Sequence, residues 1–171
     1  METWDAITSR RNVRRFTAEP VPVESLERIL EAGRRSPSSR NEQRWDFVVV
    51  TDRERLRRLS GVWRGAAWVA DAPAAIAVVA PVAGDRHTFG SIQYDLGQTT
   101  TFMMLAAADL GLGTGHAAVE DQDLARRVLG FPDGYELAWI IGLGRPVDGP
   151  LRPIRRPDRR QFDDVVHREE W

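Results

Sequence analysis

The chain has 171 residues, 42% of them hydrophobic, which is enough for one sizeable core and most simply for one domain over residues 1–171. Its net charge of −1 gives no overall attraction to nucleic acid or to an anionic membrane, so neither is an expected partner. Cysteine is absent and all 24 basic residues are arginine, which excludes disulfides, thiolate catalysis, zinc–sulfur sites and lysine chemistry. The three histidines are too scattered to suggest a metal site. No segment resembles a signal peptide or a membrane span, so the expected location is the cytoplasm.

The first half of the chain alternates helical and strand patterns. An apolar stripe of Leu26, Ile29 and Leu30 predicts a helix over Pro22–Arg34, and the continuous apolar run after Trp45 predicts a buried strand over Trp45–Thr51. The other elements expected here are a short helix at 4–9, a helix over Arg53–Leu59 capped by Asp52, a short helix that includes Trp63 and Trp68 and ends before Pro73, and a strand over Ala74–Ala80.

The second half begins with a loop over 81–89, followed by the longest helix, Gly90–Leu110. This helix has almost no polar face, so we expect it to be buried on all sides, in a core or between subunits. After the glycine-rich break at 111–115, we expect a short strand around His116–Val119, a helix from Asp121 or Asp123 to near Leu129, and a strand over Tyr135–Leu143. The tail from Pro150 has no core of its own, so it is either disordered or draped over a partner. This alternation predicts an α/β or α+β sheet covered on both faces.

An arginine-rich segment near the N-terminus is the first candidate site. Arg10, Asn12 and Arg14 are alternate residues, so their side chains point the same way if the segment is extended, and Arg11 and Arg15 add further charge. Guanidinium groups bind phosphate bidentately, so the segment is a candidate phosphate clamp. The simpler alternative is a solvated basic face.

Two further segments carry polar or conformationally special residues. Pro37-Ser38-Ser39-Arg40-Asn41 offers two hydroxyls and an amide on a turn that could also be a plain helix-to-strand connector. Gly111-Leu-Gly-Thr-Gly115 precedes His116, and a glycine-rich run of this kind is weakly specific by itself. A lone histidine is more often a packing or hydrogen-bonding residue than a catalyst, so no catalytic side chain is predicted.

Together these segments resemble the flavin-dependent nitroreductase family. The likeness rests on the arginine run, on Pro-Ser-Ser-x-Asn-x-Gln-x-Trp before a strand, on the Gly-Leu-Gly-Thr segment, and on an arginine-rich C-terminal segment ending in Val-Val-His. The resemblance implies an α+β fold of the α/β-sandwich type, with a central, mainly antiparallel sheet covered by helices. It also implies a homodimer in which the tail, about 150–171, packs on the partner subunit.

The resemblance assigns roles to particular residues. Three groups of flavin contacts are implied: the phosphate clamp of Arg10, Arg11, Asn12 and Arg14, joined by Arg159 or its neighbour Arg160; the turn of Pro37, Ser38, Ser39 and Asn41, contributed by the other subunit; and the peptide groups of His116, Ala117, Ala118 and Val119 beside the flavin ring. The chain departs from the family pattern at Asn12, where serine is usual, at Arg44, where proline is common, and at Trp68, where many members carry an asparagine or lysine.

The function implied by the resemblance is an FMN-dependent oxidoreductase. Hydride would pass from NAD(P)H through flavin N5 to a nitroaromatic, quinone or flavin-like acceptor, by a ping-pong mechanism in one pocket, with the protein supplying position and electrostatics. The alternatives are a flavin-binding storage or sensor protein without turnover, or a specialised activity such as reductive dehalogenation or flavin fragmentation. The sequence indicates neither the native acceptor nor a preference between NADH and NADPH.

Overall fold

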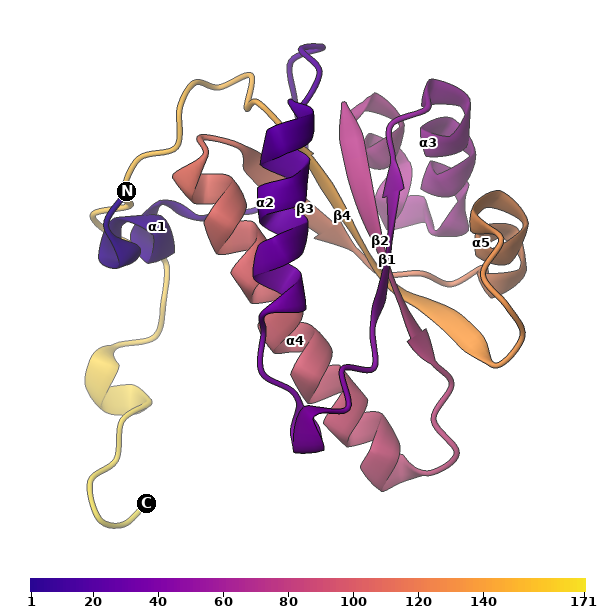
Figure 1. Cartoon of the computed structure of the whole chain (residues 1–171). Coiled ribbons are helices and arrows are strands. Elements are labelled where there is room, and N and C mark those ends of the chain that lie inside the picture. Colours follow the sequence, from indigo (N-terminus) through magenta and orange to yellow (C-terminus); the bar gives the residue numbers. More distant parts are fainter.

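The computed structural model describes all 171 residues, and its elements follow the predicted order closely (Figure 1). The α-helices are α1 (Thr3–Ser9), α2 (Val23–Arg34), α3 (Arg53–Leu59), α4 (Arg86–Asp109) and α5 (Gln122–Leu129). The strands are β1 (Asp46–Val50), β2 (Ala74–Pro81), β3 (Gly113–Ala117) and β4 (Tyr135–Gly144). Four short 3-10 helices join them, at η1 (Ser39–Asn41), η2 (Ser60–Val62), η3 (Arg64–Asp71) and η4 (Phe162–Asp164).

The four strands form one antiparallel sheet in the order β1-β2-β4-β3. The central strand β2 is paired on both sides, with Ile76 opposite Val49 of β1 and Ile141 of β4. Because this strand is buried along almost its whole length, it is a continuous apolar run rather than an alternating one. The predicted α+β class and the antiparallel sheet covered by helices are confirmed.

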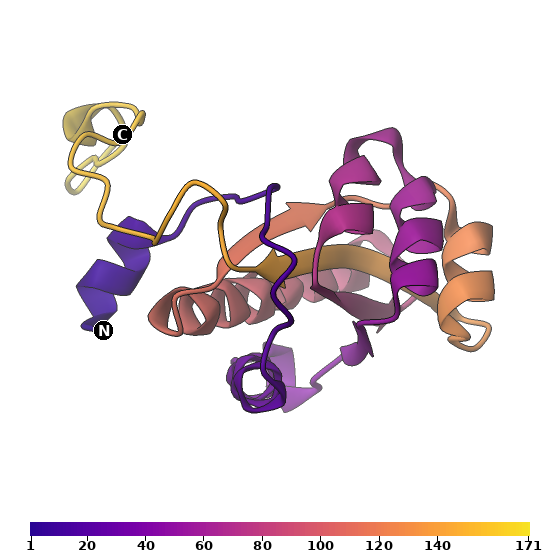
Figure 2. The same ribbon diagram turned by 90° about the horizontal axis from the view of Figure 1, so that it is seen from above.

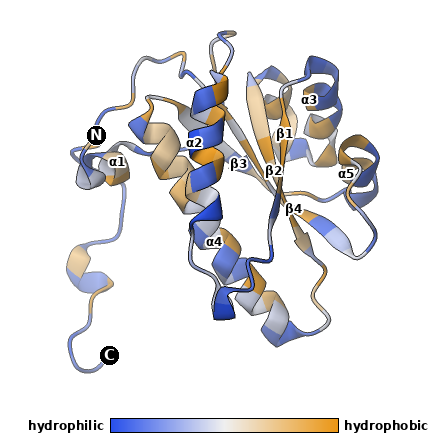
Figure 3. Cartoon of the chain, in the orientation of Figure 1, coloured by the Kyte–Doolittle hydropathy of each residue, from blue (hydrophilic) through white to orange (hydrophobic).

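Helices cover both faces of the sheet, as Figures 1 and 2 show from two directions. Along β2, Ile76 and Val78 point into the core under α2 and α4, whereas Ala75, Ala77 and Val79 point into the core under α3, η3 and α5. Figure 3 shows the result: hydrophobic colour is concentrated on the strands, and the outer helices carry hydrophilic colour on their outer surfaces. The sheet therefore separates two apolar cores of similar size.

The longest helix begins earlier than predicted. Asp85 caps it by accepting hydrogen bonds from the backbone N–H groups of His87 at 2.9 Å and Thr88 at 3.0 Å, so the helix starts at Arg86 and the expected loop over 81–89 shrinks to a few residues. The helix is not buried on all sides within the chain, because Tyr94 is 72% exposed and Phe102 41% exposed. One face of α4 packs on α2 and the sheet, and the other is open.

The short strand expected around His116–Val119 lies slightly earlier, at Gly113–Ala117. Gly113 and Gly115 of β3 pair with Gly144 and Gly142 of β4, so four glycines face one another across this edge of the sheet. Their missing side chains leave space that other segments fill. A Cβ on Gly142 would lie 2.4 Å from the ring of Trp68, which packs under the sheet here.

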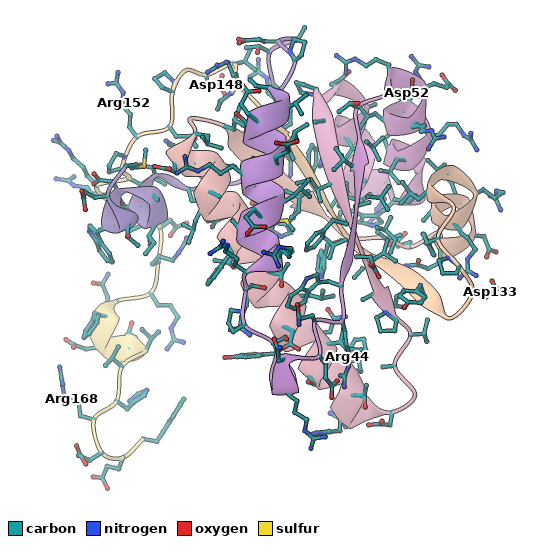
Figure 4. The ribbon with its side chains drawn as sticks, viewed as in Figure 1. Arg44, Asp52, Asp133, Asp148, Arg152 and Arg168 are labelled. Atoms are coloured by element: carbon teal, nitrogen blue, oxygen red, sulfur yellow. The ribbon has the colours of Figure 1, made fainter.

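The C-terminal tail leaves the body of the molecule beside α1, where the N–H of Ile154 donates to the carbonyl of Thr8 at 3.0 Å. Every residue from Arg152 onward is exposed. Figures 1 and 4 show the tail running away from the sheet, with Arg168 far from every other element. The expectation that this tail packs on a partner stays a prediction. None of the helices combines the length and the apolar character needed to cross a membrane.

Candidate functional site

Residues 10–17, which we call the strap, connect α1 to α2 along the edge of β3. Asn12 forms a parallel bridge with Thr114, and the N–H of Val13 donates to the Thr114 carbonyl at 2.8 Å. The strap approaches this closely only because residue 115 is glycine: a Cβ there would lie 2.4 Å from the Val13 carbonyl oxygen. The glycine-rich segment thus fixes the position of the arginine-rich one.

A hollow of about 420 Å³ lies between the strap, the open face of α4 and the sheet. Its lining contains one charged group, several small polar groups and two aromatic rings, from Arg10, Gln93, Gly97, Thr100, Thr101, Met104, His116 and Trp139. This volume and mixture are typical of a site for a small organic ligand.

The arginines of the strap are short of anionic partners. Arg10 donates to the sulfur of Met104 at 3.7 Å, a weak interaction, and Arg11 donates to the carbonyl of Arg152. Neither of these arginines, nor Arg14, forms an ion pair with a carboxylate in the chain. Arg10 lines the hollow, whereas Arg11, Asn12 and Arg14 line an adjacent one, also of about 420 Å³. Together they leave guanidinium groups available for an anion.

His116 lies at the floor of the hollow, with its ring 5.8 Å from that of Trp139 in an edge-to-face arrangement. Burial lowers the pKa of His116, and the positive charges of Arg10 and Arg14 lower it further, so the ring is neutral near pH 7. Its Nδ1 atom is buried and has no hydrogen-bond partner within the chain. Buried polar atoms are rarely left unpaired, so this nitrogen is a candidate for a hydrogen bond that the isolated chain does not supply.

The edge of β3 also presents free backbone groups. Because Thr114 uses its carbonyl toward the strap, the alternation of an antiparallel ladder turns the N–H of His116 away from β4 as well. The N–H groups of Ala118 and Val119 have no backbone acceptor in the chain. Free N–H donors are therefore present at His116, Ala118 and Val119, three of the four positions where the resemblance places contacts to the flavin ring. The fourth, Ala117, is buried in the core on the other face of the sheet.

The turn over 37–41 is held by buried polar groups of α4. The N–H of Ser39 donates to both carboxylate oxygens of Asp95, at 3.1 and 3.0 Å, and Asp95 is only 2% exposed. Arg40 and Asn41 adopt left-handed backbone angles, with φ of 52° and 57°. Such backbone strain in non-glycine residues is typical of functional segments. In this turn Pro37, Ser39 and Asn41 are exposed, and Ser38 is half-buried.

The structure does not bring this turn to the hollow within one chain. Asp95 and Thr99 hold residues 36–39, whereas Gly97 and Thr100 line the hollow. At about 100° per residue, the mean directions of these two pairs differ by roughly 150° about the axis of α4, so the pairs lie on nearly opposite faces of the helix. The expectation that Ser38 and Asn41 contact the flavin from the other subunit stays a prediction.

The tail arginines also lie apart from the strap in the single chain. Arg159 donates to the carbonyl of its neighbour Asp158, and Arg160 donates to the carbonyl of Asp164. The expected role of Arg159 or Arg160 at the phosphate stays a prediction.

Sequence reasoning missed the contribution of α4 and β4. The hollow is lined by Gln93, Gly97, Thr100, Thr101 and Trp139, none of which was predicted. The first four recur at spacings of three, four and seven, which is the signature of one helical face. That small-polar stripe was visible in the sequence, but the dense apolar run at the end of the helix obscured it.

Comparisons with known proteins agree with these features. The model of the Nitroreductase family matches residues 7–145. A protein of Archaeoglobus fulgidus with the provisional name NADH dehydrogenase/NAD(P)H nitroreductase is 32% identical over 99% of both chains, and the FMN reductase [NAD(P)H] of Bacillus subtilis is 30% identical over 99% of this chain and 74% of its own. Among solved structures, an FMN-dependent nitroreductase of Clostridium difficile superposes with a TM-score of 0.83 at 26% identity, over 97% of this chain and 98% of its own.

Proposed function

The chain belongs to the nitroreductase family, and from that premise we propose that it is an FMN-dependent enzyme that takes reducing equivalents from NAD(P)H and passes them to a small acceptor. The observation that carries the proposal is the hollow at His116, which combines an arginine without an acidic partner, free edge amides and an unpaired buried nitrogen. Nitroaromatics, quinones and free flavins are the acceptor classes proposed.

The donor groups of the site fit FMN. Its phosphate needs charged donors, which Arg10 in the hollow and Arg14 in the adjacent one would provide. Its ring needs neutral hydrogen-bonding partners beside an apolar surface, which His116 and Trp139 would provide. When bound, FMN supplies the ring that accepts a hydride and returns electrons, and the protein supplies binding, orientation and electrostatics. Neutral His116 and the free amides would hold the polar edge of such a ring without adding a charge.

A ping-pong order is part of the proposal. Arg10 and His116 line one hollow and would hold a single flavin ring there, so NAD(P)H and the acceptor would use the same place in turn. No side chain needs to act as a general acid.

A homodimer completes the proposed site. The strained turn lies on the far side of α4 from the hollow of its own chain, and the tail has no contacts beyond the neighbourhood of α1. Exposed apolar side chains lie in the tail and in α1 beside its start, including Phe162 at 65% and Trp4 at 72%. We propose that two copies exchange these segments in the cytoplasm, so that each flavin is held by both chains.

Anaerobic mixing of the purified, FMN-loaded protein with NADH or NADPH tests the activity. Bleaching of the flavin absorbance, followed by reoxidation on adding a nitroaromatic or a quinone, is the expected result. Flavin that stays oxidised with both nicotinamides would indicate storage or sensing instead. Rapid reoxidation only by halogenated aromatics would indicate the dehalogenating alternative.

Subunit exchange tests the shared site. Arg10→Ala and Asn41→Ala each damage both sites of their own homodimers, but a mixed dimer collects both lesions in one site and leaves the other intact. With equal amounts and random pairing, half of the dimers are mixed, so activity should rise to about a quarter of wild type. Confirmed exchange without recovered activity would show that the turn over 37–41 is only a connector.

A further inference from the structure

A second basic hollow lies on the other side of the strap from His116, between the strap and α3. It encloses about 690 Å³, and we call it the arginine groove. Arg14 and Arg15 line one wall, and Arg53 and Arg57 line the opposite wall. Asp71 is the only acidic residue in the lining, although the whole chain carries a net charge of −1. Figure 2 shows how the strap passes close to the helices on this side of the sheet.

The arginines of the groove have few acidic partners: only Arg57 forms a close ion pair, with Glu54 of the same helix, which lies outside the lining of the groove. Arg53 donates to the carbonyls of Ala70 and Ala72, at 3.5 and 3.1 Å, which fixes its guanidinium at the end of η3. Arg57 is four residues further along α3 and therefore projects from the same face of the helix. Arg14 forms no ion pair, and Arg15 only approaches the exposed carboxylate of Asp148 at 3.7 Å.

Apolar groups complete the groove. Phe16 lines the groove together with Val147 and Ala70, and its ring lies 6.2 Å from that of Trp68. A ligand that fits must therefore carry negative charge next to a flat or apolar body. Simple counterions meet the first condition but not the second.

We propose that the arginine groove binds a phosphate group of a nucleotide, as a second site that adjoins the FMN site of the proposed function and shares Arg14 with it. The four arginines that line the groove carry guanidinium groups of the kind that bind phosphate bidentately, and Arg14 and Arg15 have no close acidic partner. Phe16 offers a surface for the base or sugar. Two sources share this chemistry. One is the adenosine 2′-phosphate of NADPH, reaching over the strap from the hollow, and the other is a free nucleotide that binds independently of catalysis.

Binding to the FMN-loaded protein, measured by calorimetry, tests the groove directly. The probes are adenosine 2′,5′-bisphosphate, 5′-AMP and inorganic pyrophosphate. The test variant is Arg15→Gln/Arg57→Gln, whose side chains are 75% and 67% exposed and so do not support the core. The matched control is Arg55→Gln/Arg58→Gln, which removes the same charge from α3 at positions outside the groove.

We expect at least one of these probes to bind, and the groove variant to lose about tenfold to a hundredfold in affinity while the control loses less than threefold. Preference for the bisphosphate, with a raised KM for NADPH and an unchanged KM for NADH in the groove variant, identifies the coenzyme as the source. Equal binding of 5′-AMP or pyrophosphate with unchanged KM values identifies a free nucleotide or phosphate compound. The proposal is overturned if none of the three probes binds, or if the control variant loses as much affinity as the groove variant. In either case, flavin bleaching by NADH in the same preparation would show that the proposed oxidoreductase function still holds.

Discussion

Replacing Gly115 by alanine should displace the strap and weaken FMN binding at the same time. The added Cβ would lie 2.4 Å from the Val13 carbonyl oxygen and 3.0 Å from the Trp68 ring, whereas ordinary contacts begin at 3.4 Å. The strap must therefore move by about 1 Å, since its backbone atom cannot rotate away as a side chain would. That shift strains the hydrogen bond from Val13 to Thr114.

Overpacking of this kind costs about 1–3 kcal/mol, which corresponds to a fall in Tm of roughly 2–12 °C for a chain of this size. Arg10 and Arg14 move with the strap, so we also expect FMN affinity to fall at least tenfold, because each lost 1.4 kcal/mol is a factor of ten. The backbone of Gly115 is not left-handed, so alanine adds bulk without conformational strain.

Thermal unfolding with and without FMN, together with flavin fluorescence titration, measures both effects. Gly90→Ala is the matched control: it makes the same chemical change in α4, where a Cβ would meet nothing within 4 Å, and should raise stability by up to about 1 kcal/mol. Wild-type stability in the Gly115→Ala protein would refute the packing argument. Lowered stability with unchanged FMN affinity would show that the strap does not carry the phosphate clamp.

Three other predictions concern single side chains. Asp95→Ala removes the acceptor of the Ser39 N–H and should lower the free energy of unfolding by about 1.5–3 kcal/mol, measured in urea. Asp95→Asn keeps one acceptor oxygen and should recover part of that loss. Equal losses in both variants would argue against the hydrogen bond. Asp85→Ala removes the cap of α4 and should lower the unfolding free energy by about 0.5–2 kcal/mol, with Asp85→Ser restoring most of it. Because the folded state lowers the pKa of His116, only the unfolded chain takes up that proton as the pH falls below about 6.5, so stability should decrease from that pH down to the folded pKa. His116→Gln should remove this part of the pH dependence, and identical profiles in the two proteins would contradict a neutral buried ring.

The sequence by itself determined the elements of the fold and the chemical character of the binding segments. Continuous apolar runs such as Ala74–Ala80 can be satisfied only in a strand covered on both faces, and this requirement does not depend on the rest of the chain. The strap arginines and the turn over 37–41 were likewise visible as local patterns. Helix boundaries were less secure, because a single capping side chain, Asp85, extends α4 by a full turn.

Only the tertiary structure decided which of those segments meet. Pairing of β3 at the sheet edge brings the strap to His116, since Gly115 leaves room for the backbone of Val13 and Gly113 leaves room for its side chain. The rotation of α4 about its own axis then places Gly97 and Thr100 in the hollow and turns Asp95, with the 37–41 segment, to the opposite side. Local sequence patterns encode which face of a helix or strand is apolar. The relative positions of segments far apart in the sequence depend instead on how the helices and strands pack on one another, and no local pattern contains that information.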